Sequence, residues 1–569
     1  MARASKFKPV SVLSFIRISV VFIFWGCWVM GYTQNIRIEE TKNNFSKQQW
    51  LKVNGGLSLS SIYYMGNVSS QRDPFNYFVA GNVNFRLFNT VNVPLSINLT
   101  NSGSNFTYPT LPNRFSLHPS YKWATVHLGD ISMVFSPYTL SDHQFTGVGL
   151  ELSPGRWKVA AMYGRMQRKV EYDSTNTAVL AAYKRMGVGA KLRYDHDVFS
   201  IGSSVFLAKD DEHSLSYTPD SLGIYPQQNI ASQLEMTVNL SGNFRLMGEY
   251  AFSLLERDLR IADGASVVFY QAYNVGLSYR FLKNDIAIKY ERIDPQYTTL
   301  GTYYSNNDYE NITLNFATFL LKDKLNLSAN VGMQNDDLDN TKESRTERFV
   351  GAIAVTYNPV KQLSVNANYS NFQTYKNVKS QFDYINQYSV VQNLDTLDFL
   401  QLSQNATLGI TYQLQQTETQ AQSLQLNTTW QTAKDTYEGV SQPTNDMTMI
   451  NASVLHSIQQ LKKGVGLNSS FNITHDSMDG SRTLMFGPTL ALSARFLNKT
   501  IQSGLSSSCN WSYTNDVYEQ FITNFRLYGG YTLLKKHTFN VSGIYQYQCK
   551  QQSSDTYYLN LTLSYNYTF

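Results

Sequence analysis

The chain has 569 residues, of which 16 % are charged and 14 % are aromatic, with 39 Tyr and 32 Phe. Soluble domains usually carry about 25 % charged residues. The mean hydropathy is only −0.30, and no apolar run after residue 35 is long enough for a membrane helix. This composition excludes a bundle of membrane helices and is expected of strands with one face toward lipid and one toward polar space.

The N-terminus has the three regions of a secretory signal peptide. Four basic residues are followed by the apolar run Ile18–Met30 and by small residues that favour cleavage before Gln34. Residues 1–33 are therefore predicted to be a signal peptide, with an uncleaved signal anchor as the alternative. Lipidation at Cys27 is disfavoured, because the aromatic residues before it fit a lipoprotein cleavage site poorly. Residues 34–49 are expected to form a short periplasmic segment.

Cleavage would remove four basic residues from a chain of net charge +5 and leave a mature charge of +1. A nearly neutral chain gives no support for nucleic-acid binding. Two cysteines remain, Cys509 and Cys549, each on the apolar face of its predicted strand. Since these strands are not neighbours, we expect no disulfide, and so few cysteines exclude a zinc-thiolate site.

Residues 103–143 form the longest segment between predicted strands and are rich in aromatic residues and Leu. Loops longer than about 15 residues are usually functional or disordered, and this composition argues against disorder. We predict an ordered insertion that either folds into a lumen or caps the surface. Two additional membrane strands, centred on Trp123–Phe135, are the third alternative. The residues assigned to a plug or constriction are Arg114, His118, Trp123, His127, Asp130 and Tyr138.

The same segment contains residue types that are common in catalytic and metal sites. His118, His127 and His143 lie near Asp130 and Asp142, but their spacings match no metal-ligand motif. Ser141, Asp142 and His143 are adjacent, whereas the partners of a triad converge from separate segments. Asp210, Asp211 and His213 could form part of a protease site, but the sequence offers no second pair of acidic residues to complete it. With no phosphate loop, dinucleotide motif or zinc-protease helix either, we predict no enzyme, no cofactor and no metal.

Alternation of apolar and polar residues recurs along the chain in runs of roughly ten, the length of a tilted membrane strand. One example is Leu363, Val365, Ala367 and Tyr369 against Ser364, Asn366, Asn368 and Ser370. Short turns alternate with longer polar stretches such as 210–229 and 374–397. Eleven short turns and twelve longer loops predict a single all-β antiparallel barrel over 50–569 with 24 strands, in a range of 22–26. An even number places both termini in the periplasm.

The polar faces of these strands carry Asn, Ser, Thr and Gln with few charges. If they line a lumen, the surface is neutral and rich in hydrogen-bonding groups. Such a lining suits neutral hydrophilic solutes, for example saccharides, better than selected ions, since charged rings confer ionic selectivity. The alternative, which the sequence leaves equally open, is that these residues only fill or hydrate the interior.

The last stretch, Tyr557–Phe569, alternates strictly and ends in the aromatic residues Tyr565, Tyr567 and Phe569. Together with the signal peptide and loop asymmetry, it resembles bacterial outer-membrane β-barrels. The resemblance implies recognition of these aromatics by the barrel-assembly machinery. TonB-dependent receptors are similar but place a plug before the barrel, and the 16 or so residues between Gln34 and Trp50 leave no room for one. Fimbrial ushers are also similar, with larger plugs and additional periplasmic domains.

The sequence therefore predicts a protein of the bacterial outer membrane that forms a transport or secretion pore for hydrophilic solutes, with residues 103–143 occluding it. The alternative is a non-conducting surface protein that binds or assembles through its long outer loops. Its expected partners are the lipid bilayer, the assembly machinery and a hydrophilic solute. The sequence identifies no partner protein.

Overall fold

The computed structural model describes residues 50–67, 74–101, 114–172, 174, 181–217, 222–261, 266–303, 306–339, 341, 347–371, 374–376, 400–433, 436–437, 440–441, 447–478, 480–497 and 499–569. The predicted signal peptide 1–33, the segment 34–49 and most of the loop 374–397 lie outside these residues. The chain divides into two compact units, and residues 53–86 with 90–569 form the one described below as the barrel unit.

All regular elements in this part of the chain are strands. The first half contains β1 (Leu51–Gly66), β2 (Phe75–Leu87), β3 (Val91–Thr100), β4 (Arg114–Leu117), β5 (Ser120–Tyr121), β6 (Ala124–Ser132), β7 (Gln144–Leu152), β8 (Trp157–Gln167), β9 (Arg185–Asp195), β10 (Phe199–Asp210), β11 (Gln228–Asn239), β12 (Phe244–Glu256), β13 (Val267–Phe281) and β14 (Asn284–Ile293). Within the described residues, no helix is both long and apolar enough to cross a bilayer.

The second half continues the same wall. It contains β15 (Tyr309–Leu320), β16 (Leu325–Asp336), β17 (Glu347–Val360), β18 (Leu363–Ser370), β19 (Thr374–Lys376), β20 (Leu400–Gln416), β21 (Gln420–Ala433), β24 (Met447–Gln460), β25 (Val465–Met478), β26 (Ser481–Phe496), β27 (Ile501–Thr514), β28 (Val517–Leu533), β29 (His537–Lys550) and β30 (Thr556–Thr568). A separate small hairpin, β22 (Thr436–Tyr437) and β23 (Val440–Ser441), lies outside the wall sheet.

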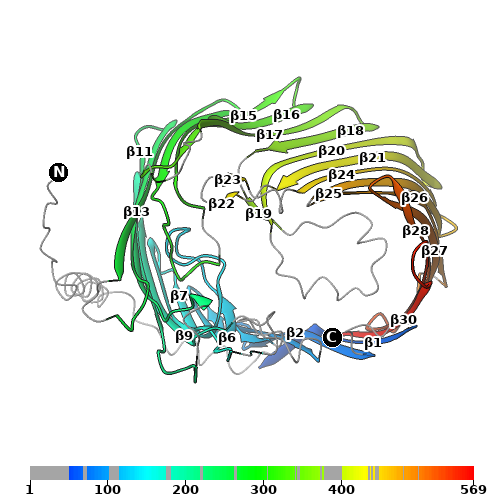
Figure 1. The fold of residues 1–569 in the computed structure, drawn as a ribbon, viewed down its shortest axis with the longest axis horizontal. Coiled ribbons are helices and arrows are strands. Elements are labelled where there is room, and N and C mark those ends of the chain that lie inside the picture. The colour runs from blue at the N-terminus through cyan, green and yellow to red at the C-terminus, as the bar shows by residue number, and fades with distance from the viewer. Residues whose placement is uncertain are drawn as a thin grey trace, which may run out of the picture. The chain divides into compact units, whose positions relative to one another are not determined.

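The wall closes because the last strand pairs with the first. Residues Gly56 to Gly66 of β1 run antiparallel to β30 from Thr568 to Tyr558, so blue and red strands lie side by side in Figure 1. Beyond the paired strands, the Phe569 and Gly55 backbones exchange hydrogen bonds of 3.0 and 3.1 Å. Closure pairs the edge groups that hydrocarbon could not satisfy.

The sheet holds 28 strand segments, but two wall positions are each shared by two segments. β4 and β5 both pair with β3 and β6, and β18 and β19 both pair with β20. The wall therefore has 26 positions. The all-β antiparallel barrel is confirmed, and its size is close to the predicted 24 strands, at the top of the predicted range.

The difference of two strands lies in residues 103–143, where the structure agrees with the third alternative of two additional wall strands and departs from an insertion that lies entirely outside the wall. Residues 114–132 form β4, β5 and β6, which belong to the wall. Their alternation is interrupted, since Pro119 separates β4 from β5 and β4 has only four residues. Only the part after Ser132 leaves the wall, and residues 102–113 lie outside the described residues.

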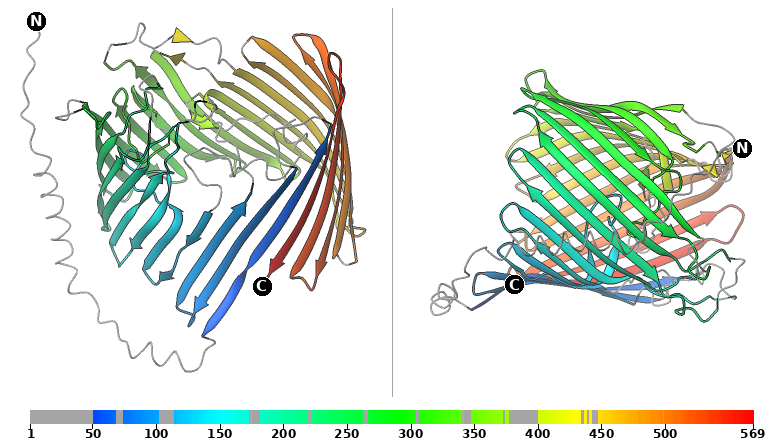
Figure 2. Two further views of the ribbon diagram at one scale, coloured as in Figure 1. Left: turned by 60° about the horizontal axis from the view of Figure 1, so that its bottom comes forward. Right: turned by 90° about the vertical axis from the view of Figure 1, so that its left-hand side faces the viewer.

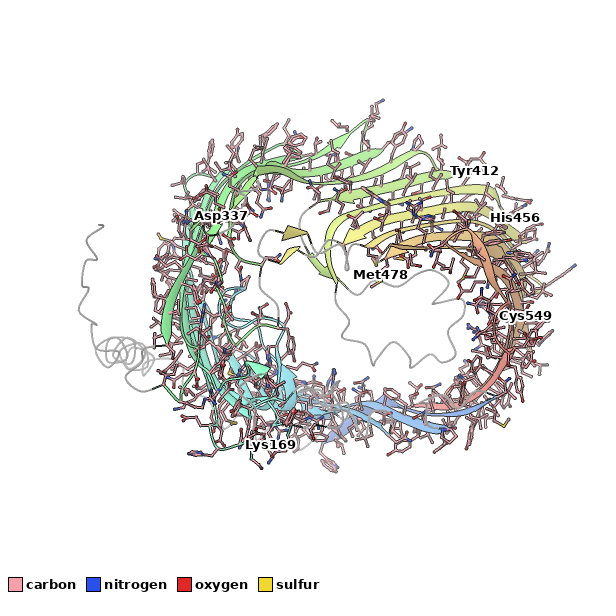
Figure 3. All side chains as sticks on the ribbon, viewed as in Figure 1. Lys169, Asp337, Tyr412, His456, Met478 and Cys549 are labelled. Carbon is pink, nitrogen blue, oxygen red and sulfur yellow. The ribbon has the colours of Figure 1, made fainter. Side chains whose placement is uncertain are left out.

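The outer face of the wall is apolar around the whole circumference. Side chains project from both faces (Figure 3), and those on the outer face include exposed aliphatic and aromatic residues on strand after strand. Examples in chain order are Leu57, Tyr163, Val188, Leu234, Val275, Ile312, Phe349, Leu408, Phe471, Leu505, Phe525 and Leu559. Soluble monomers rarely expose apolar patches beyond a few hundred Å², so this continuous band is a surface for lipid.

The two ends of the barrel unit differ. Short connections such as 282–283, 497–500 and 534–536 define one end, here the turn end, and longer ones such as 133–143 and 294–308 define the loop end. The strands between them are inclined in Figure 2. Aromatic pairs occur toward both ends, with Phe244 and Tyr279 at 4.3 Å near the turn end and Tyr63 and Phe75 at 5.0 Å near the loop end. Two such belts are typical of membrane barrels.

Candidate functional site in the barrel lumen

Residues 133–143, here the inner segment, connect β6 to β7 and pack on the inner face of the wall. The inward direction follows from the parity of the strands: on β10, Ile201 is exposed outside while Phe206 is fully buried on the opposite face. Phe135 of the inner segment lies beside the inward Gly189 of β9, where an added Cβ would be 2.7 Å from its ring. The inner segment therefore occupies space inside the barrel (Figure 1).

Polar side chains of the wall hold the inner segment through three contacts. The Ser136 hydroxyl donates to a Glu249 carboxylate oxygen at 2.6 Å, and the Tyr138 hydroxyl donates to Glu291 at 2.6 Å. The Lys191 ammonium donates to the carbonyl of Phe135. Hydrogen bonds to charged groups contribute about 1.5–3 kcal/mol each, so these contacts anchor the inner segment to β9, β12 and β14.

A second connection at the loop end, residues 294–303, lies against the inner segment and is called the inner loop. The Tyr297 hydroxyl donates to the Tyr138 carbonyl at 2.8 Å, and the Thr299 hydroxyl donates to the Thr139 carbonyl at 2.7 Å. Leu140 and Gly301 form a parallel bridge. The inner loop thereby supplies partners for backbone groups that would otherwise be buried without a hydrogen bond.

The inner segment, the inner loop and the wall between them share an apolar core. The members of this core are Ile131, Met133, Phe135, Tyr138, Leu140, Phe145, Met162, Met166, Phe206, Ala208, Ala251, Leu255, Tyr270, Ala272, Ile293, Tyr297 and Leu300. Leu140 and Phe206 have no exposed surface at all. An apolar core inside a barrel stabilises the inner segment as it would a small globular domain.

Burial sets the protonation of the groups in this core. Desolvation, and then the charge of Glu291, raise the pKa of Tyr138, and desolvation and the Glu249 charge raise the pKa of Tyr297. Both phenols therefore remain hydrogen-bond donors. Desolvation lowers the pKa of His143 to about 4, despite its hydrogen bond to a backbone carbonyl. Its neutral ring stacks on Tyr303 at 4.1 Å.

A strip of ion pairs lies next to these anchors on the inner faces of β8 to β11. Lys158 is 2.8 Å from Asp195, Arg193 contacts both Asp195 and Glu235, and Lys191 is 3.7 Å from Glu235. Each of these charges has a partner of opposite sign. With three cations and two carboxylates, the strip adds local polarity and a net charge of only +1 to this part of the lumen.

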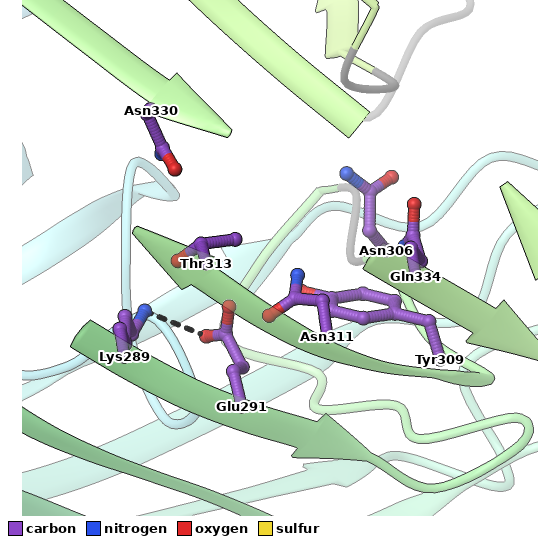
Figure 4. Close-up of a pocket in the computed structure, with 8 residues that line it drawn as sticks. All are labelled: Lys289, Glu291, Asn306, Tyr309, Asn311, Thr313, Asn330 and Gln334. Carbon is purple, nitrogen blue, oxygen red and sulfur yellow. Dashed lines mark ion pairs between the residues drawn. The ribbon is translucent and has the colours of Figure 1, made fainter. Parts of the chain in front are cut away.

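A polar pocket of about 220 Å³ adjoins the Glu291 anchor (Figure 4). It is lined by Lys289, Glu291, Asn306, Tyr309, Asn311, Thr313, Asn330 and Gln334. Ile288, Ile312 and Met333 are exposed on the outer face of β14, β15 and β16, so the alternate residues of these strands face inward. Lys289 and Glu291 are 3.2 Å apart.

The inner wall from β27 to β30 has a different lining. A hydrogen-bonded relay runs from the Thr556 hydroxyl to Gln548 at 2.9 Å, from Gln548 to Gln546 at 2.7 Å, from Gln546 to Asn524 at 2.7 Å, and from Asn524 to the Ser508 hydroxyl at 3.0 Å. All five side chains are neutral. This amide relay is the clearest form of the neutral lining that the sequence predicts.

The structure places most of the predicted plug residues in or beside the wall strands. Arg114 begins β4, Trp123 lies in the turn before β6, and Asp130 of β6 accepts hydrogen bonds from the Phe115 amide and the Thr146 hydroxyl. His118 and His127 are brought together with 2.8 Å between their Nδ1 atoms. Only Tyr138 lies in the inner segment.

The wall residues that hold the inner segment were not found from the sequence. Lys191 and Glu291 gave no distinct signal, because the inward faces of β9 and β14 carry other charges such as Arg193 and Lys289. Glu249 stands on a more neutral face of β12, and that isolation of charge was an available signal. Tyr297 and Thr299 carried no local signal, because their partners are backbone carbonyls about 160 residues away in sequence. Over the described residues, no group of three or more His, Cys, Asp or Glu side chains could hold a metal ion.

The chain matches no protein family, and no curated protein is similar in sequence. Among solved structures it is similar to the P pilus usher translocation pore, with 11 % identity, 91 % of this chain and 99 % of that chain covered, and a TM-score of 0.38. The FrpB iron transporter from Neisseria meningitidis has 11 % identity, covers 93 % of this chain and 84 % of its own, and scores 0.34. The ferric citrate transporter FecA has 9 % identity, 90 % and 78 % coverage, and a TM-score of 0.36.

The chain is a β-barrel of the bacterial outer-membrane kind. This conclusion follows from the wall itself, because the sheet closes on itself and an apolar band surrounds it. A sheet that spans lipid must be closed, since hydrocarbon offers no partner for an open edge. The same two features are those of a membrane-spanning barrel and agree with the predicted location in the outer membrane.

Proposed function

We propose that the protein is a transport pore for neutral hydrophilic solutes. The observation that carries the proposal is the lumen itself: 26 strand positions enclose more space than inward side chains can fill. Barrels with as few as 16–18 strands already hold an aqueous channel. The inner segment and inner loop pack on β9–β14, and the described inward side chains on the β27–β30 part of the wall are mostly polar.

The chemistry of the lining supports a neutral solute. The inward residues of the β27–β30 part of the wall are mostly amides and hydroxyls, as in the relay from Thr556 to Ser508, and groups of this kind bind uncharged solutes by hydrogen bonds. The charged strip near Arg193 and Glu235 is internally paired. A pore selective for ions would be expected to present rings of like charge.

The inner segment is proposed as the constriction of this pore. It is anchored to three strands and to the inner loop, so it can keep one position while solute passes beside it, or leave that position as a unit. This proposal replaces the predicted plug 103–143 with the shorter segment 133–143. Replacement of the whole predicted insertion would also remove β4, β5 and β6 from the wall.

The test is single-channel conductance of the purified protein beside a variant in which residues 134–142 are replaced by a Gly/Ser linker of equal length. Open steps from the intact protein that become larger in the variant support a pore constricted by the inner segment. Equal steps from both support a pore without that constriction. Silence from both, with folding verified by circular dichroism, overturns the pore and favours the surface-binding alternative.

We also propose that the terminal aromatics Tyr565, Tyr567 and Phe569 are recognised during assembly. Their place on the closing strand supports this, because β30 must reach its position before the wall can close. Phe569→Ala is expected to reduce the amount of folded protein in cells while the purified chain still refolds in detergent. An equal loss in both settings would indicate a purely structural role.

A further inference from the structure

The pocket on β14–β16 has donors and acceptors that the protein itself does not fully use. Asn311 of β15 is 6 % exposed, and its side-chain oxygen is buried without a hydrogen-bond partner, as is the side-chain oxygen of Asn330 on β16. Both line the pocket. Two buried acceptors without donors favour a ligand that brings hydrogen-bond donors.

The other lining groups restrict the charge and shape of that ligand. Lys289 and Glu291 balance each other at 3.2 Å, so an anion would meet the carboxylate and a cation the ammonium. Tyr309 contributes an aromatic ring, and Thr313 a hydroxyl that both donates and accepts. The volume of about 220 Å³ is below the roughly 300–1,000 Å³ of sites for drug-sized ligands, so a single small ring fits best.

We propose that this pocket is a binding subsite for one neutral, hydroxyl-rich ring, a monosaccharide unit of the transported solute. The inference rests on the proposed pore function and gives the class of solute. Vicinal hydroxyl groups can donate to the Asn311 and Asn330 oxygens while they accept from the amide groups of the same side chains. The ring face packs against Tyr309.

Glu291 connects this subsite to the inner segment. Its carboxylate accepts from Tyr138 at 2.6 Å, is paired with Lys289 and also hydrogen-bonds Tyr309. A carboxylate has about four acceptor positions, so a ligand hydroxyl would take the last one or displace Tyr138. Asn306 belongs to the same loop-end connection as Tyr297, which holds the Tyr138 carbonyl. When the ligand hydroxyl displaces Tyr138, occupation of the subsite weakens the hold on the inner segment.

The test is a ligand-detected NMR titration of the detergent-folded full-length protein with methyl glucoside, compared with glucosamine and glucuronate. The detergent must not be a glycoside; an amine oxide is suitable. The expected dissociation constant for methyl glucoside is in the millimolar range, since small ligands gain little free energy per atom. The charged sugars should bind at least several-fold more weakly.

Three variants locate the binding. Asn311→Ala with Asn330→Ala should weaken it at least tenfold, whereas Asn472→Ala, an equally inward Asn on β25, should leave it unchanged. Tyr138→Phe should tighten it several-fold, because one competitor for Glu291 is removed. No binding by the wild type up to about 100 mM, or equal binding by the double variant, would overturn the subsite.

The outcome is separable from that of the pore. Conductance is measured in salt without sugar, and the titration is made without a membrane. A conducting protein that binds no sugar retains the pore and loses the subsite. A silent protein that binds methyl glucoside through Asn311 and Asn330 loses the pore and retains the subsite.

Discussion

Two parts of the same barrel wall have opposite interiors. From β9 to β14 the inner face packs against the inner segment, with buried apolar side chains such as Phe206 and single carboxylates such as Glu249. From β27 to β30 the inner face carries the amide relay, in which neutral side chains bond to one another across strands. The outer faces of both parts are apolar.

The difference shows how a barrel can build a local core without changing its wall. Small residues make the approach possible, since a Cβ at Gly187 would lie 2.8 Å from Met166 and one at Gly189 would lie 2.7 Å from Phe135. Hydroxyl groups of the inner segment then reach wall carboxylates. In the relay, where the described wall carries only amides and hydroxyls, each side chain is instead hydrogen-bonded to a neighbouring side chain of the wall.

The largest expected effect comes from removal of both carboxylate anchors. Glu249→Ala with Glu291→Ala would leave the Ser136 and Tyr138 hydroxyls buried without acceptors, a cost of about 3–6 kcal/mol for the pair. The open population of the inner segment should rise by about 10²–10⁴. Hydrogen exchange at the Phe135 and Thr139 amides, which bond within the segment, measures this.

The matched control for the anchors is Glu519→Ala. Glu519 accepts the Thr514 hydroxyl at 2.6 Å in the β27–β28 part of the wall, so it has the same chemistry away from the inner segment. Its loss should leave exchange at Phe135 and Thr139 unchanged. Similar acceleration by both changes would mean that the barrel loosens as a whole, and the contrast between the two parts would be lost.

A second, smaller effect is expected from Gly301→Ala. The added Cβ would lie 2.2 Å from the Thr139 carbonyl oxygen and 3.0 Å from the Phe206 ring, so the inner loop must move away from the inner segment. Such overpacking typically costs about 1–3 kcal/mol. Exchange at Thr139 should accelerate accordingly. Gly529→Ala, where a Cβ would meet nothing within 4 Å, should have no effect on it.

The sequence predicted the wall better than the interior for a physical reason. Alternation is a local property, so strands such as β30 can be found from about ten residues. The strands around β5 and β6 could be predicted only as one of three alternatives, because β5 has two residues and Pro119 interrupts the pattern before it. A wall position made of two short pieces leaves too little periodicity to recognise.

The interior depends on contacts between distant residues. Tyr138 was among the predicted plug residues, but its partners Glu291 and Tyr297 lie more than 150 residues away. The three histidines of this segment, which the sequence does not assign to a common site, have separate partners: His118 bonds to His127, whereas His143 stacks on Tyr303. No spacing rule links such residues, because the curvature of the barrel decides which strands face each other.

A pH-dependent effect should be confined to the part with the inner segment. His143 has a pKa of about 4 when folded and about 6.5 when unfolded. Between these values the unfolded segment binds a proton that the folded one excludes, so stability is full above pH 6.5 and falls as the pH is lowered toward 4. The loss is at most about 3 kcal/mol.

Hydrogen exchange at Thr139 as a function of pH, corrected for the intrinsic exchange rate, measures this loss. His143→Gln should remove the pH dependence, because Gln does not titrate in this range. A pH dependence that persists in the variant would assign the effect to another group. The amide relay contains no titratable side chain, so exchange at the Asn524 and Gln546 amides should stay constant over the same range.

The smallest effect is expected in the relay itself. Gln546→Leu would remove the 2.7 Å hydrogen bonds to the Asn524 oxygen and from the Gln548 amide, which costs about 1–3 kcal/mol. Gln546 is only 1 % exposed, so water replaces little of this. Because Asn524 and Gln548 have further partners, the net loss in urea unfolding should be near the lower limit. Ser542→Ala on the same strand is the control.

Exchange at Thr139 should not change, because no part of the inner segment contacts the relay in the apolar core or through the anchors. Acceleration there would show that the two interiors are coupled through the wall, and that the amide relay helps to set the shape on which the inner segment packs.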